Sequence, residues 1–323
     1  MPAAIARGGG RIACEEVPAP EPTPGKVLVR MQMASICGSD LHIVYHGYPI
    51  KDYPLAPGAP GHEGVGVVAD GGGTGFAEGE TVLTAPNIWG SRNFARYQLI
   101  DPGFLVRLPV GREKAHLLMA QQLGTVLFAA RKLPDLNGKT VAVIGQGSAG
   151  LFHDFVVRRL GAARVITVEP NAARREAGRA LDVDATVDVT GQKAVDAVLE
   201  LTGGKGADVV VDAVGGYPTL NDAVGMVRAE GHVHVFGLPD RFGHTPFDLA
   251  GFVLKRLDMT TVFGAQDEPG VPAFHEAVRL IAEGAIDMAP YVTHTFPLQR
   301  VAEAFALAHE PRDGALKVSL TID

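Results

Sequence analysis

The chain has 323 residues, of which 46% are hydrophobic and 20% are charged, a balance typical of a globular protein with room for two domains. Its net charge of −7, with no Lys/Arg run longer than two residues, excludes nucleic acid and anionic membranes as expected partners. It has two cysteines, no apolar run of the ~18 residues that span a bilayer and no apolar signal-peptide core, which together predict a cytoplasmic protein.

The first 125 residues are predicted to form an irregular, mainly β domain. Alternating apolar and polar residues, or runs of small apolar ones, predict strands at 27–33, 61–68, 81–85 and 94–100. Ser39 can cap a helix, so a short helix is expected over 40–45. The Pro-, Gly- and Tyr-rich stretch that follows, 47–60, is expected to be an irregular loop.

Several residues near the predicted strand ends have the chemistry of a metal site. Cys37 and His62 offer a thiolate and an imidazole, which suit zinc, and Glu63 adds a carboxylate. Ser39 and His42 follow the cysteine by two and five residues, and a hydroxyl and an imidazole so placed could pass a substrate proton to water. Taken singly, the cysteine is better explained as a small buried hydrophobe and the histidine as a hydrogen-bonded structural residue.

A helix is expected over 112–132, and the stretch after it carries a dinucleotide-binding fingerprint. An apolar strand at 141–144 leads into a glycine turn and a helix, and a second strand at 165–168 ends on an acid, Glu169. The turn consists of Gly145, Gln146, Gly147, Ser148, Ala149 and Gly150. Its glycines permit the tight turn, the approach of a pyrophosphate and close packing of the helix, whose N-terminus attracts phosphate. Glu169 can bind both adenosine-ribose hydroxyls and would repel a 2′-phosphate, which predicts NAD rather than NADP.

The alternation of strands and helices continues to the end of the chain. Strands are expected at 207–213, 233–236 and 259–263, and helices at 220–228 and 274–283. The near-continuous apolar strand at 207–213 is typical of a parallel sheet that is buried on both faces. A last strand at 315–320 is expected to rejoin the first domain. The predicted class is therefore α/β, with a doubly wound parallel sheet over 126–264 between segments 1–125 and 265–323.

Three motifs in a fixed order resemble the zinc-containing medium-chain dehydrogenase/reductase family. They are the segment Cys37–His42 (CGSDLH), the segment Gly61–Gly64 (GHEG) and the glycine fingerprint, and the similarity covers nearly the whole chain. Members of this family include alcohol, sorbitol and threonine dehydrogenases. The resemblance implies a GroES-like catalytic domain, built from both chain ends, around a Rossmann domain that binds NAD.

The same resemblance implies roles for the residues of the first domain. Cys37 and His62 would bind one catalytic zinc, with Glu63 as a nearby or exchanging ligand and Asp40 orienting the histidine. Ser39 and His42 would form the proton relay. The zinc would lower the pKa of a substrate hydroxyl, and the alkoxide would then deliver hydride to the nicotinamide ring.

Two departures from the family pattern stand out. Many relatives carry a lobe of four cysteines that holds a structural zinc, and that lobe is missing here, since no cysteine follows Cys37. Relatives also supply a third catalytic ligand, Cys, Asp or Glu, where this chain has Gln121. Either Gln121 binds the metal, or Glu63 takes over, or zinc occupancy is low; a polar residue on a helix face is the structural alternative.

The resemblance also extends the expected cofactor site. It adds Ala213 and Val214 after one strand, and Gly237 and Leu238 after the next, near the nicotinamide. Arg174 either lies over the adenine or ribose or is a solvated helix charge. On the fingerprint helix His153 and Asp154, and on a later strand His232 and His234, are expected to be structural.

These observations favour a zinc- and NAD-dependent alcohol or polyol dehydrogenase, which would also reduce the matching ketone or aldehyde. The alternatives are a zinc-free NAD(P)H-dependent quinone or enoyl reductase of the same superfamily, and a non-catalytic NAD-binding protein. Trp89 and Tyr48 are expected to wall the substrate pocket, where they could stack on a sugar or cyclitol ring. Strands at the edge of the Rossmann sheet predict a homodimer or homotetramer.

Overall fold

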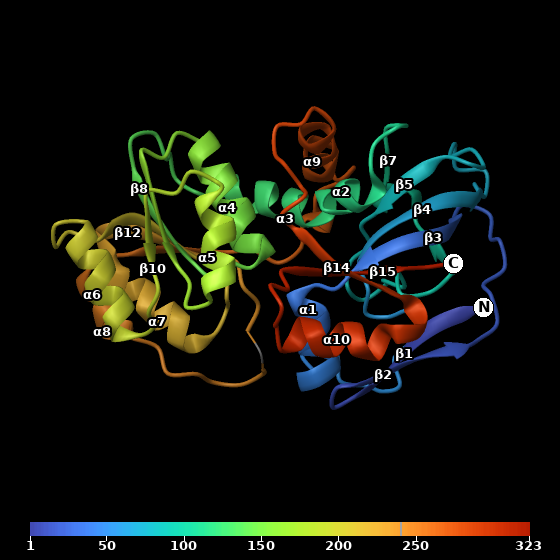
Figure 1. Cartoon of the computed structure of the whole chain (residues 1–323), viewed down its shortest axis with the longest axis horizontal. Coiled ribbons are helices and arrows are strands. Elements are labelled where there is room, and N and C mark those ends of the chain that lie inside the picture. Colours follow the sequence, from blue (N-terminus) through green and yellow to red (C-terminus); the bar gives the residue numbers. More distant parts are fainter. Residues whose placement is uncertain (240) are drawn as a thin grey trace. The chain divides into compact units, whose positions relative to one another are not determined.

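The computed structural model describes residues 1–239 and 241–323 and divides into two compact units (Figure 1). Met1–Thr125 and Gly264–Asp323 form one, here the terminal unit, and Val126–Phe263 form the other, the central unit. The first is mainly β and the second is a parallel sheet with helices, so the predicted fold class is confirmed. No helix in the described part of the chain is both long and apolar enough to cross a membrane.

The terminal unit is built on a seven-stranded sheet with the order β14-β15-β3-β4-β5-β7, in which β6 also pairs with β3. Its strands are β3 (Val27–Ser35), β4 (Glu63–Asp70), β5 (Thr81–Thr84), β6 (Tyr97–Ile100), β7 (Leu105–Arg107), β14 (Val292–Pro297) and β15 (Lys317–Thr321). A separate hairpin joins β1 (Pro2–Gly8) to β2 (Arg11–Glu16). Because β15 pairs antiparallel with β3, the last strand of the chain lies in the sheet that begins at Val27.

Short helices fill the connections of the terminal unit. They are α1 (Gly38–Leu41), the π-helix η1 (His42–His46), α2 (Lys114–Leu118), α9 (Pro272–Ala282), α10 (Val301–His309) and the 3-10 turns η2 (Pro102–Phe104), η3 (Ala265–Asp267) and η4 (Leu298–Arg300). The helix α3 (Ala120–Ala130) begins in this unit and ends in the central one. The amphipathic α10 buries Val301, Ala304 and Phe305 in the same core as the apolar residues of β3.

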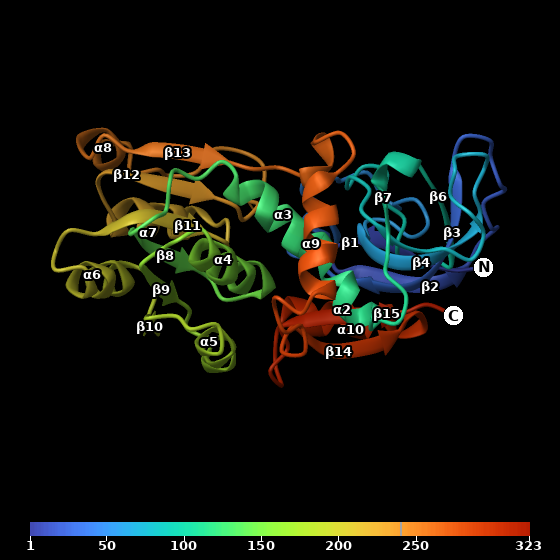
Figure 2. The same cartoon turned by 90° about the horizontal axis from the view of Figure 1, so that it is seen from above.

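The central unit is a six-stranded, all-parallel sheet with the order β10-β9-β8-β11-β12-β13 (Figure 2). Its strands are β8 (Thr140–Ile144), β9 (Arg164–Val168), β10 (Ala185–Val187), β11 (Ala207–Asp212), β12 (Val227–Val235) and β13 (Asp258–Thr261). The helices are α4 (Ser148–Arg159), α5 (Ala172–Arg179), α6 (Gln192–Leu201), α7 (Tyr217–Met226) and α8 (Leu249–Leu254).

Two apolar cores, one on each face, hold this sheet. Successive residues of a strand point to opposite faces, so Val141 and Val143 of β8 join a core with Val157 of α4, whereas Ala142 and Ile144 join the core of α6 and α7. Burial on both faces explains why these strands have apolar residues at nearly every position.

The structure differs from the sequence prediction mainly at the ends of elements. The helix expected over 112–132 is two helices, separated at Met119, which is the C-cap of α2. The helix expected over 220–228 ends at Met226, and β12 begins at the next residue. The strand expected over 94–100 is regular only from Tyr97, although Ala95 forms an isolated bridge with Ala3.

The polar residues of the fingerprint helix are buried in the central unit. His153 Nδ1 donates a hydrogen bond of 2.8 Å to the Ala149 carbonyl, and burial lowers the pKa of the ring to about 4. Burial raises the pKa of Asp154 well above its usual value. On β12, His232 Nε2 and His234 Nδ1 share the hydroxyl of Thr260, at 2.8 and 2.7 Å. The three histidines make these hydrogen bonds inside the central unit, which fits the structural roles expected of them.

Candidate functional site

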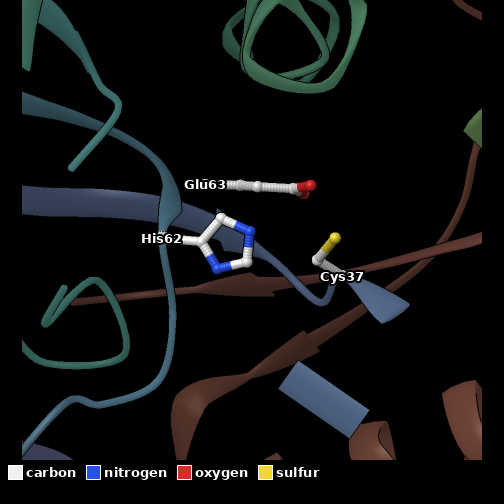
Figure 3. Close-up of side chains that lie close together, drawn as sticks. All are labelled: Cys37, His62 and Glu63. Carbon is white, nitrogen blue, oxygen red and sulfur yellow. The ribbon is translucent and has the colours of Figure 1, made fainter. Parts of the chain in front are cut away.

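Three side chains with metal-ligand chemistry converge in the terminal unit (Figure 3). Cys37 follows β3, His62 precedes β4 and Glu63 is the first residue of β4. The two strands are antiparallel neighbours, so the end of one meets the start of the other. The candidate ligand atoms all lie within 4.8 Å of one another, and they form the only such cluster of His, Cys and acidic residues in the described part of the chain.

Asp40 orients His62 within this cluster. Its Oδ1 lies 3.1 Å from His62 Nδ1, while its Oδ2 accepts a hydrogen bond of 2.8 Å from the Cys37 backbone N–H. Because Nδ1 faces the carboxylate, Nε2 is the nitrogen left for a metal. Burial lowers the pKa of His62, but Asp40 and Cys37 outweigh it and hold the pKa well above the usual value, so metal binding would displace a proton.

The two carboxylate oxygens of Glu63 have different surroundings. Oε2 accepts hydrogen bonds from Ser35 Oγ and from Lys317 Nζ, the latter at 2.6 Å. Oε1 is buried and has no hydrogen-bond partner among the described residues. Burial raises the pKa of Glu63, but Lys317 and His62 lower it by more, so the carboxylate is ionised. A buried, charged oxygen without a donor fits a metal-binding position, so the residues present are compatible with zinc.

Lys317 is the residue of this site that sequence reasoning missed. It lies at the start of β15, is only 2% exposed, and also donates to Gln122 Oε1 at 3.3 Å. Burial lowers the pKa of its ammonium, but Glu63 raises it by more, so the group is charged. A lysine in a strand that also carries Val318 and Leu320 was the signal available in the sequence.

The other predicted residues of this site lie in α1, η1 and α3. Ser39 is buried, and its Oγ is 3.5 Å from His62 Nε2. His42 begins η1, where its ring centroid is 5.9 Å from that of His46. Gln121 is buried near the start of α3, and its neighbour Gln122 is the one that contacts Lys317. A metal-binding role for Gln121 therefore stays a prediction.

The glycine fingerprint forms the predicted turn between β8 and α4 in the central unit. Gly145 has a φ of +90°, and a Cβ at Gly150 would lie 1.8 Å from the Gly145 carbonyl oxygen. A Cβ at Gly147, by contrast, would meet nothing within 4 Å. Gly147 is the N-cap of α4 and has no side chain that could bond the free N–H groups of the first turn. These N–H groups can therefore bind phosphate.

Glu169 closes the turn at the end of β9. It is 5% exposed, and its two oxygens accept backbone hydrogen bonds of 2.8 Å, one from Gln146 and one from Asn171. Each oxygen keeps a lone pair for another donor, such as a ribose hydroxyl. Gln146 is fully buried, so its side chain faces the interior rather than solvent.

The loops after β11 and β12 depend on an acid that sequence reasoning did not single out. Asp212 Oδ1 accepts hydrogen bonds from the backbone of Val214 at 3.0 Å and Gly215 at 3.2 Å, and Oδ2 accepts one from Thr219 at 3.0 Å. A Cβ at Gly237 would lie 2.2 Å from the Gly215 nitrogen, so the two loops touch backbone to backbone. Ala213, Val214, Gly237 and Leu238 thus follow neighbouring strands of the sheet, at the carboxyl ends where parallel sheets bind ligands.

Arg174 lies on α5, beyond the loop that follows Glu169. Its backbone N–H donates to the N-cap Asn171, and its side chain is half-buried. Neither this hydrogen bond nor the burial of the side chain assigns the guanidinium to a cofactor, so the role of Arg174 in binding adenine or ribose stays a prediction.

Comparison with known proteins agrees with this architecture. The alcohol dehydrogenase GroES-like domain matches residues 23–109, and the zinc-binding dehydrogenase domain matches residues 150–283. The chain is 25% identical to sorbitol dehydrogenase of Gallus gallus, over 99% of this chain and 96% of that protein. It is also 25% identical to L-threonine 3-dehydrogenase of Legionella pneumophila (strain Corby), over 93% of this chain and 94% of that protein.

Among solved structures, alcohol dehydrogenase TADH from Thermus sp. ATN1 superposes with a TM-score of 0.83 at 27% identity, over the full length of both chains. Both domains therefore have counterparts, in the same order along the chain, in known dehydrogenases. The chain belongs to the zinc-type medium-chain dehydrogenase family.

The second and third glycines of the fingerprint should respond differently to substitution. Gly150→Ala should lower the free energy of unfolding by about 1–3 kcal/mol, because its Cβ would push α4 away from β8. Gly147→Ser, with a residue favoured at N-caps, should leave stability within about 0.5 kcal/mol but weaken NAD binding, since the new side chain would stand where phosphate approaches. Denaturant unfolding and NAD titration measure the two effects; unchanged NAD affinity in Gly147→Ser would contradict the phosphate assignment.

Proposed function

We propose that this protein is a zinc- and NAD-dependent dehydrogenase of alcohols or polyols, acting also on the matching ketones or aldehydes. The observation that carries the proposal is the cluster of Cys37, His62 and Glu63, in which a buried carboxylate oxygen has no hydrogen-bond donor. The sorbitol, threonine and alcohol dehydrogenases among its relatives support the substrate class. A dinucleotide fold in the same chain supports hydride transfer as the reaction.

Cys37, His62 and Glu63 would hold the single zinc, with Gln121 as the alternative third ligand. Bound there, zinc would supply Lewis-acid polarisation of the substrate oxygen. The chain's own contribution is to hold the candidate ligand side chains in place. Asp40 fixes the His62 ring, and the backbone N–H of Cys37 fixes Asp40 in turn.

Ser39 and His42 would carry the substrate proton. The Ser39 hydroxyl lies beside His62 Nε2, so it can accept a hydrogen bond from a substrate hydroxyl that approaches the cluster. His42 follows one turn later and leads to the more exposed His46. This direction, from a buried hydroxyl to an exposed imidazole, is the one a proton must take to reach water.

We propose that residues 45–60 and 87–94 of the terminal unit wall the substrate pocket. Trp89, which is 56% exposed, and Tyr48 offer aromatic faces that suit a sugar or cyclitol ring. A plain apolar alcohol would use the same faces without needing the polar groups. We also propose a cytoplasmic location, supported by the two free cysteines.

The function is tested by metal analysis combined with a substrate screen. The protein as purified should contain about one zinc per chain and reduce NAD with at least one member of a panel of aliphatic alcohols, polyols and cyclitols. Cys37→Ala should lose both zinc and activity. Reduction of quinones or activated alkenes by a zinc-free sample would instead identify the zinc-free reductase, and NAD binding without any turnover would identify a non-catalytic protein.

The choice of NAD over NADP is proposed to depend on Glu169. Glu169→Ala removes two acceptor oxygens and the negative charge, so the KM for NAD should rise about tenfold while discrimination against NADP falls. Glu169→Gln is the matched control, because it keeps the size and one acceptor but loses the repulsion of a 2′-phosphate. Steady-state kinetics with both cofactors measure the ratio; a wild-type preference for NADP would show that this interpretation is wrong.

A homodimer or homotetramer is proposed from the edge of the central sheet. Among the described residues β13 pairs with β12 alone, and the preceding helix α8 exposes Leu249, Val253 and Leu254, at 61%, 59% and 77%. Such a surface is unfavourable in a monomer. Light scattering at micromolar concentration should give a multiple of the chain mass, reduced in Leu254→Asp but not in Val110→Asp, which changes an equally apolar, fully exposed residue of the terminal unit. A monomer mass for the wild type would contradict the proposal.

A further inference from the structure

Lys317 is a buried cation that contacts residues of the candidate metal site. Burying an ammonium costs free energy, so a fully buried lysine is uncommon unless it is paired. Lys317 Nζ forms an ion pair with Glu63 Oε2 at 2.6 Å and donates a hydrogen bond to Gln122 Oε1 at 3.3 Å. The ammonium thus meets the carboxylate of one candidate ligand and an amide next to another.

The contacts of Glu63 are asymmetric in a way that a simple ion pair does not require. Oε2 accepts from both Lys317 on β15 and Ser35 on the neighbouring strand β3. Oε1 receives no donor in the described residues, and a Glu63 oxygen lies within 4.8 Å of the Cys37 and His62 ligand atoms. Two donors on one oxygen fix the carboxylate's rotation and leave the other oxygen free.

Charge explains why this chain needs the carboxylate to be fixed. The resemblance to zinc-containing dehydrogenases implies Cys, Asp or Glu at position 121, where this chain has the neutral Gln121. Glu63 is therefore the only anionic oxygen in the cluster, and Asp40 is already committed to His62 and Cys37. If Glu63 rotated freely, a bound cation would have one strong ligand fewer.

We propose that Lys317 is a positioning residue that holds the Glu63 carboxylate with Oε1 directed at Cys37 and His62, making Glu63 a fixed third ligand in place of the missing acid at position 121. The proposal rests on the proposed function only in requiring that the cluster binds a divalent metal. It replaces the expectation of an exchanging Glu63 with that of a carboxylate whose orientation is set before the metal arrives. Groups that orient a ligand typically contribute about 10- to 100-fold to metal affinity.

Cobalt(II) binding tests this without reference to turnover. The zinc-depleted full-length protein is titrated with Co²⁺ in competition with a chelator, and the absorption bands of the thiolate-bound ion report its ligands. Lys317→Met should bind Co²⁺ about 10- to 100-fold more weakly and shift these bands, and Glu63→Gln should do the same. Lys317→Arg, which keeps the charge and the donors, should restore most of the affinity.

Two further variants separate positioning from general stability. Lys255→Met removes a lysine of the central unit whose Nζ donates to three backbone carbonyls, so it should lower the melting temperature and leave Co²⁺ binding unchanged. Glu63→Gln/Lys317→Met removes both charges together, so it should fold even where Lys317→Met does not, and it should bind Co²⁺ no more weakly than Glu63→Gln alone.

The possible results decide the question. Wild-type Co²⁺ affinity and spectrum in Lys317→Met, or a further loss in the double variant relative to Glu63→Gln, would overturn the positioning role. A protein that binds Co²⁺ as expected but oxidises no alcohol would contradict the proposed function and leave the role of Lys317 standing. The reverse outcome, alcohol oxidation with an unchanged metal site in Lys317→Met, would retain the function and reject the inference.

Discussion

The register of three strands brings together the residues of the candidate metal site. Ser35, at the end of β3, lies opposite Glu63 on β4 and opposite Ser319 on β15. Side chains alternate along a strand, so Lys317, two residues before Ser319, lies on the same face as Ser319. A slip of one residue in either pairing would turn Lys317 or Glu63 to the opposite face and leave a buried charge without its partner. The site therefore exists only after residues from both ends of the chain have joined one sheet.

Each buried carboxylate of the cluster faces a partner that can carry positive charge, and one carboxylate oxygen lacks a hydrogen bond among the described residues. Asp40 faces His62, and Glu63 faces Lys317. Pairs of this kind recover much of the cost of removing charge from water, but removing one partner typically costs about 3–5 kcal/mol. Glu63 Oε1 is the exception, since it receives no donor in the described residues. The proposed ligand role of Glu63 would account for the cost of desolvating that oxygen.

The sequence predicted the two sites to different extents, for a physical reason. The dinucleotide turn is contiguous, and its glycines are required by backbone geometry, so Gly145 and Gly150 could be assigned roles from spacing alone, and the confirmed α/β class followed from apolar periodicity. Lys317 and Asp212 were missed because their partners are set by strand pairing and loop closure. No local pattern indicates that a lysine in a terminal strand will meet the first residue of β4.

Stability alone does not explain a charged pair at this place. Apolar side chains of similar volume often replace a buried ion pair at no loss of stability, and here they would also avoid an oxygen without a donor. What an apolar pair cannot provide is an anion with one oxygen fixed and the other open. The neutral Gln121 and Gln122 on α3 leave that task to Glu63, and the donors on Oε2 come from Ser35 and Lys317. The ion pair is thus better understood as the support of a ligand than as a contribution to the fold.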